Sequence, residues 1–166
     1  MSILQICEWL ENTPVGTLVR ESLWGFQIVV AIHILGLTLS VGTLVWWDLR
    51  LCGVSMPRCP VREVYRRLMP WTLSGFAVMF ISGGLLFSGF ATKAYGNLYF
   101  RLKVVAILLA GANALFYHLV TERQIAQWND AARPPLAARI AGLTSILLWA
   151  MVIMAGRKIS YTMFSY

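Results

Sequence analysis

The chain has 166 residues, of which 58% are hydrophobic and only 13% are charged. This length allows one domain, and the composition is too apolar for an ordinary soluble protein, so it indicates a single integral membrane domain over residues 1–166. The formal charge of +7 does not indicate nucleic-acid binding, because the basic residues gather at the ends of apolar segments, where they act as topology and lipid-headgroup signals.

Residues 1–20 have neither the basic start nor the sustained apolar core of a cleavable signal peptide, so we expect them to be retained. Apolar residues are interspersed here with Glu8 and Glu11, a pattern typical of a short amphipathic helix that lies in the membrane interface. Thr13 and Pro14 suit the N-cap and the first position of a second helix.

Four apolar segments follow that are long enough to cross a bilayer, whose hydrocarbon core needs about 20 helical residues. We expect these spans at residues 23–47, 71–91, 98–121 and 140–156. The predicted fold class is therefore all-α, a four-transmembrane-helix bundle with an amphipathic N-terminal interfacial helix. Gly75, Ser82 and Gly89 recur on one face of the second span, which predicts close helix packing there.

An even number of spans places both termini on the same side of the membrane. The two loops on the opposite side carry eight Lys and Arg residues, and the side with the termini carries six. Because short basic loops stay in the cytoplasm, we expect both termini to lie outside it.

His33 lies well inside the first span, where an imidazole costs free energy unless something binds it. On a helical wheel, His33 shares a face with Gly36 and Ser40, and such a small-residue face suits close packing or a flat ligand. The alternative is that His33 only hydrogen-bonds a hydroxyl or carbonyl group of a neighbouring helix.

The third span carries two further candidate ligands, Lys103 near its start and His118 near its end. Gly111 shares the face of His118 and leaves room beside that imidazole. Two histidines beside small residues on two helices suggest a haem within the bundle, with His33 and His118 as axial ligands of the iron. The depths agree poorly, because His118 lies roughly 15 Å further down its helix than His33.

Lys103 is the alternative second ligand, because it lies about 7 Å down its helix and its long side chain can extend toward the level of His33. A third arrangement gives each histidine its own haem, so the chain would bind one or two haems. The alternatives without a cofactor are that His118 lies in the membrane interface and that the Lys103 side chain extends to the lipid headgroups.

Other chemistry has less support in the sequence. Cys52, Met56 and Cys59 are soft ligands in one loop and could hold Cu(I), but their spacing matches no standard metal motif. The sequence has no C-x-x-C-H motif for covalent haem attachment and no Gly-rich phosphate loop. Its few acidic residues lie at membrane edges or in loops, which does not favour an ion-coupled transporter.

Two parts of the chain resemble small bacterial membrane proteins of the CopD-like and HemJ-like groups. In the first helix, the similar residues are Ala31 to Gly36 (AIHILG), Val41-Gly42 and Asp48-Leu49-Arg50. In the third helix, they are Phe100 to Val104 (FRLKV), Asn113 and His118.

The HemJ-like group consists of haem b proteins that act in protoporphyrinogen oxidation. Resemblance to it implies a non-covalently bound haem b associated with a first-helix histidine and a third-helix lysine. These positions correspond to His33 and Lys103. Resemblance to the CopD-like group instead implies copper uptake or handling.

We therefore expect a multi-pass protein of the bacterial inner membrane, with periplasmic termini, that binds haem b and takes part in electron transfer. The candidate cofactor-binding residues are His33, His118, Lys103, Gly36, Ser40, Gly111 and Asn113. Expected partners are the lipid bilayer and either a second copy of the chain or a membrane redox complex. An oxidase activity, copper handling and a cofactor-free membrane anchor remain as alternatives.

Overall fold

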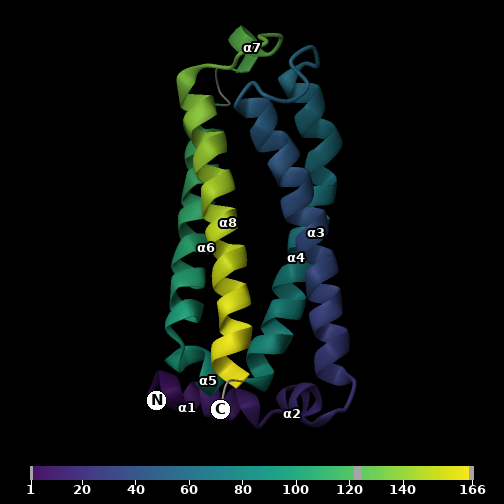
Figure 1. Ribbon diagram of the computed structural model, residues 1–166, viewed down its shortest axis with the longest axis vertical. Coiled ribbons are helices and arrows are strands. Elements are labelled where there is room, and N and C mark those ends of the chain that lie inside the picture. The colour runs from purple at the N-terminus through teal and green to yellow at the C-terminus, as the bar shows by residue number, and fades with distance from the viewer. Residues whose placement is uncertain (1, 122–124, 165–166) are drawn as a thin grey trace.

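The computed structural model describes residues 2–121 and 125–164, and every regular element in these residues is helical. Four long helices run along one another, and shorter helices lie at the two ends of the bundle (Figure 1). The long helices are α3 (Gly25–Leu51), α4 (Val61–Gly89), α6 (Leu98–Phe116), continued by the π-helical turn η1 (Tyr117–Thr121), and α8 (Leu136–Phe164). Within the described residues these four are long and apolar enough to cross a membrane, which confirms the predicted all-α, four-span fold.

Two of the long helices extend well beyond the apolar segments from which they were predicted. α4 begins at Val61, so Arg62 and Arg66 lie on its first turns and not in a loop. α8 continues through Arg157 and Lys158 to Phe164. Long basic side chains can reach the headgroups while their backbone stays helical, so a charged residue does not mark the end of a membrane helix.

The short helices α1 (Ile3–Glu11) and α2 (Pro14–Glu21) lie across the end of the bundle that also holds the end of α8 (Figure 1). The predicted start of α2 is confirmed, because the Thr13 hydroxyl accepts a hydrogen bond from the Gly16 amide at 3.2 Å and Pro14 is the first helical residue. A Cβ atom on Gly16 would lie 2.7 Å from the Ser88 carbonyl oxygen, so α2 rests directly on the end of α4.

The N-terminal helices are held to the bundle by a polar contact and expose many of their apolar side chains. The Glu11 carboxylate accepts hydrogen bonds from the Thr92 amide at 2.8 Å and its hydroxyl at 2.6 Å, which ties α1 to α5 (Ala91–Gly96). The large apolar side chains exposed on this part of the chain are Ile3, Leu4, Ile6, Trp9, Val15, Leu18, Leu23 and Trp24. This distribution is typical of helices that lie at a membrane surface.

Small residues bring α3 and α4 close together, as the recurrence on the second span predicts. A Cβ atom on Gly75 would lie 2.5 Å from the backbone nitrogen of Ser40 and 2.9 Å from the carbonyl oxygen of Gly36. Ser40 is fully buried, and its hydroxyl lies 3.1 Å from the Met79 sulfur. Backbone contact of this kind is the usual form of helix association in membranes.

Arg50 links two chain segments at the end of the bundle away from the termini, and its side chain is fully buried. Its Nε and Nη2 atoms donate to the Cys59 carbonyl at 3.0 and 2.9 Å, and Nη2 also donates to the Ala131 carbonyl at 3.0 Å. Arg50 thereby joins the α3–α4 loop to the segment that follows α7 (Ile125–Trp128). An apolar cluster that includes Trp47, Val61 and Trp128 packs at this end.

Candidate functional site

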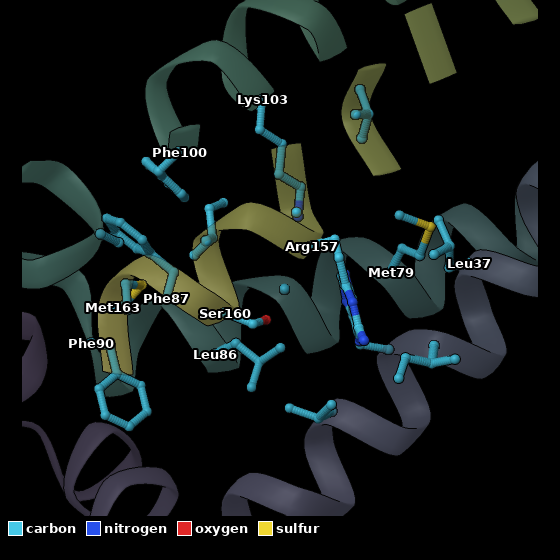
Figure 2. Close-up of a pocket in the computed structure, with 18 of the residues that line it drawn as sticks. Leu37, Met79, Leu86, Phe87, Phe90, Phe100, Lys103, Arg157, Ser160 and Met163 are labelled. Atoms are coloured by element: carbon cyan, nitrogen blue, oxygen red, sulfur yellow. The ribbon is translucent and has the colours of Figure 1, made fainter. Parts of the chain in front are cut away.

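An apolar cavity of about 360 Å³ lies among the long helices (Figure 2). Its lining residues belong to the parts of these helices nearer the end of the bundle that holds the termini. Its lining residues come from α3, α4, α5, α6 and α8. At its deep end are Leu37 and Val152, which belong to or pack against the core cluster between α3, α6 and α8. Phe90 and Met163 line the end nearer the termini. The volume is within the range of small-ligand pockets, about 300 to 1,000 Å³.

Aromatic side chains form much of the apolar wall. Phe87 on α4 stacks on Phe100 of α6 with ring centroids 5.3 Å apart and an angle of 12° between the planes. Phe26 on α3 meets Phe90 edge to face at 5.4 Å. These flat surfaces suit a flat, apolar ligand.

Basic side chains supply the charge in this cavity. Among the lining residues, the titratable ones are His33 on α3, Lys103 on α6 and Arg157 on α8, and none of the lining residues is acidic. Figure 2 shows Lys103 extending from α6 toward α8. A Cβ atom on Gly156 of α8 would lie 3.7 Å from the Lys103 Nζ atom, so the amine ends beside this glycine.

Ser82 on α4 determines how the His33 imidazole is presented. The Ser82 hydroxyl donates to the Val78 carbonyl at 2.6 Å, a bond that uses its single proton. His33 Nδ1 lies 2.9 Å from the same hydroxyl oxygen, and with that hydroxyl proton on the Val78 carbonyl the imidazole Nδ1–H is the donor. In this tautomer Nε2 keeps its lone pair, which is the arrangement that metal-ligating histidines adopt.

A glycine leaves room for this imidazole. A Cβ atom on Gly83 would lie 3.2 Å from His33 Cε1 and 3.7 Å from Nδ1. A Cβ atom on the neighbouring Gly84 would instead point into open space, with no other part of the described chain packed within 4 Å of it. The two adjacent glycines therefore have different surroundings. Gly83 is needed at the site because the side chain of any other residue there would press on the His33 ring.

Four of the residues expected at the site lie outside the cavity lining. Gly36 and Ser40 are buried between α3 and α4. Asn113 donates from Nδ2 to the Ala141 carbonyl at 2.9 Å and so joins α6 to α8. Gly111 is exposed, with open space where a Cβ would be. In this structure these four contribute to helix packing or to the outer surface.

His118 is also remote from the cavity. It lies in η1, where its ring meets Tyr65 edge to face at a centroid distance of 6.0 Å and Tyr117 at 5.5 Å. At about 1.5 Å of rise per residue, His118 is roughly 22 Å further along the helix than Lys103. The structure therefore brings His33 together with Lys103 in one cavity and does not bring His33 together with His118.

The chemistry of the cavity lining is compatible with a haem. An imidazole nitrogen with a free lone pair and an unprotonated amine nitrogen can both bind iron, and the aromatic walls suit the flat macrocycle. Sequence reasoning assigned no ligand role to Ser82, Gly83 or Arg157. Ser82 had a signal in its recurrence with Gly75 and Gly89, but that pattern predicts packing and not its hydrogen bond to an imidazole.

The sulfur atoms of the α3–α4 loop have separate surroundings. Cys52 donates a weak hydrogen bond from Sγ to the Arg139 carbonyl at 3.7 Å, Met56 packs against the apolar cluster, and Cys59 is exposed. Burial and the nearby Asp48 carboxyl raise the pKa of the Cys52 thiol, and Arg139 partly opposes them. These contacts give the copper alternative no added support.

Comparison with known proteins places the chain in a family. No curated protein and no solved structure matches it. One family model, described as a family of unknown function (DUF6644), matches residues 6–162 and so includes α3, α4, α6 and nearly all of α8. The chain therefore belongs to the family of unknown function DUF6644.

Proposed function

We propose that this protein binds haem b in the cavity between its long helices and takes part in electron transfer in a bacterial inner membrane. The observation that carries the proposal is the 2.9 Å hydrogen bond between His33 Nδ1 and the Ser82 hydroxyl at an apolar cavity that His33 lines. With Nδ1 as the donor, Nε2 is free to bind a metal. An imidazole that served only to join two helices would need no cavity beside it. The resemblance of the first and third helices to HemJ-like proteins supports the same ligand.

Each polar residue of the site has a role in this proposal. His33 would hold the haem iron, and Ser82 would hold the tautomer and ring orientation of this imidazole. Lys103, in its neutral amine form, would be the second residue to hold the iron, because it lines the same cavity. Bound haem would supply a one-electron couple at its iron, and burial among aromatic side chains would tune the potential of that couple. The protein then passes electrons to a membrane redox partner or acts as a subunit of a redox complex.

The first test is a reduced-minus-oxidised absorption spectrum of the detergent-purified protein, with haem quantified per chain. We expect sharp Soret and alpha bands at one haem per chain, lost in His33→Ala and retained in His118→Ala. Lys103→Ala should keep the haem but change the spectrum to that of a five-coordinate or water-ligated site. A featureless spectrum from haem-replete cells would overturn the proposal and favour a cofactor-free membrane anchor.

The membrane orientation has its own test. The loop between α3 and α4 lies at the end of the bundle opposite the termini (Figure 1) and holds the exposed Cys59. That end is proposed to face the cytoplasm. A membrane-impermeant maleimide should therefore label Cys59 only after cells are permeabilised, with Cys59→Ser as the control. Labelling of intact cells would reverse the proposed orientation.

A further inference from the structure

Arg157 is a cation at the cavity with no acidic partner among the described residues. The two ion pairs of the described chain join Arg20 to Glu21 and Arg67 to Glu63, away from this site. Arg157 donates from Nη2 to the Tyr161 hydroxyl at 3.1 Å, and its guanidinium lies 5.2 Å from the centroid of that ring. These contacts orient the guanidinium, but Tyr161 carries no compensating negative charge.

The lining of the cavity contains no carboxylate. With His33 and Lys103 as neutral ligands of a metal, Arg157 is the lining residue that keeps a positive charge. The Arg157 side chain is exposed and also lines the cavity, so a carboxylate of an occupant would supply the charge partner that the described residues do not provide. The lining therefore favours a ligand with an apolar body and an acidic edge.

The position of Arg157 on α8 indicates where that edge would lie. The lining residues of α8 run from Val152, which is buried in the core, to Met163 near the end of the helix, a rise of about 16 Å. Arg157 and Ser160 lie between these limits and, being three residues apart, share a helix face. The acidic edge would thus lie near the middle of the part of α8 that lines the cavity.

We propose that Arg157 anchors a carboxylate of the cavity's ligand through charge-assisted hydrogen bonds. The inference rests on the proposed function insofar as that ligand is haem b, whose carboxylates lie on one edge of the macrocycle. The inference gives Arg157 the role of selecting and orienting the ligand. His33 would bind the metal, and Arg157 would bind the carboxylate at the acidic edge.

The test compares free carboxylates with esterified ones. The full chain is purified without haem in a detergent with uncharged headgroups, and its affinity is measured by spectral titration. The four probes are hemin, hemin dimethyl ester, iron-free protoporphyrin and its dimethyl ester. We expect the wild-type protein to bind each free acid roughly ten- to a hundredfold more tightly than its ester, as charge-assisted hydrogen bonds predict.

Variants assign this preference to one side chain. Arg157→Gln should bind acid and ester with equal affinity, and Arg157→Lys should recover part of the preference. Lys158→Gln is the matched control, because Lys158 is an exposed cation like its neighbour Arg157 but does not line the cavity, and it should behave as wild type. Thermal unfolding of each variant checks that the bundle is intact.

The outcomes separate this inference from the haem proposal. Equal affinity for acid and ester in the wild-type protein, or a preference that survives in Arg157→Gln, overturns the role of Arg157 even if haem binds through His33. An Arg157-dependent preference for iron-free protoporphyrin, without any His33-dependent haem spectrum, supports the anchor and overturns the haem protein. If the protein binds none of the four probes, both the haem proposal and the role of Arg157 are overturned.

Discussion

The Nδ1 atom of His33 on α3 lies 2.9 Å from the hydroxyl oxygen of Ser82 on α4, 49 residues further along the chain. This bond joins the two helices that small residues already bring into backbone contact, so the imidazole is held on a rigid part of the fold. A ligand that is oriented by a second side chain binds its metal more tightly than one that is free to rotate.

Ser82→Ala should weaken haem binding while leaving the fold intact. The variant removes the hydroxyl that holds Nδ1, and loss of such a supporting group typically costs about 10- to 100-fold in affinity. Titration with haem measures this change. Ser74→Ala is the control, because the exposed Ser74 hydroxyl only donates to the Trp71 carbonyl of its own helix. Equal affinities in the two variants would contradict the role given to Ser82.

Gly83→Ala should disturb the imidazole, whereas Gly84→Ala should not. A methyl group on Gly83 would lie 3.2 Å from His33 Cε1, and one on Gly84 would meet no packed neighbour within 4 Å. Both changes carry the same helix-propensity gain, so their difference reports only the contact with the ring. We expect lower haem content and a shifted Soret band in Gly83→Ala alone. Identical spectra would show that the ring does not sit against Gly83.

Gly75→Ala should destabilise the α3–α4 pair. The added methyl would lie 2.5 Å from the Ser40 nitrogen and 2.9 Å from the Gly36 carbonyl oxygen, and backbone atoms cannot move aside as a flexible side chain can. Overpacking of this kind costs about 1 to 3 kcal/mol. Thermal unfolding in detergent should show a lower Tm than wild type. Gly42→Ala, with no packed neighbour within 4 Å, should keep or slightly raise the Tm.

Cys52 should react with alkylating reagents only at raised pH. Burial and the Asp48 carboxyl raise the pKa of this thiol, so a smaller fraction is thiolate at pH 7 than for an ordinary cysteine, whose pKa is about 8.5. The labelling rate of Cys52, measured by mass spectrometry in a Cys7→Ser/Cys59→Ser variant, should keep rising with pH above that value. Arg139→Gln removes the opposing positive charge and should move the midpoint higher still. A midpoint at or below about 8.5 would contradict the burial of the thiol.

Helix ends show one limit of prediction from the sequence. Apolar segments identify four spans, but α4 begins ten residues before its predicted start and α8 continues eight residues past its predicted end. Arg62 and Arg157 lie within helices because their flexible side chains carry the charge away from the backbone. Hydropathy reports where the bilayer core lies, and it does not report where the hydrogen-bonded helix stops.

The candidate site shows the other limit. The periodicity of the third span gives the direction of Lys103 and His118 around the helix axis, but not which neighbouring helix each one meets. A depth estimate favours Lys103 over His118 as the partner of His33, and the cavity lining includes Lys103 and not His118. Neither Ser82 nor Arg157 has a local pattern that reveals its neighbours.

The sequence by itself determined the all-α class, the four spans, the surface helices at the N-terminus and the small-residue face of α4, because each depends on local composition or on a short period. Only the tertiary structure decided that His33, Lys103 and Arg157 line one cavity, with Ser82 bonded to His33 and His118 elsewhere. Contacts between helices depend on tilt, depth and close approach, and these follow from the packing of the whole bundle.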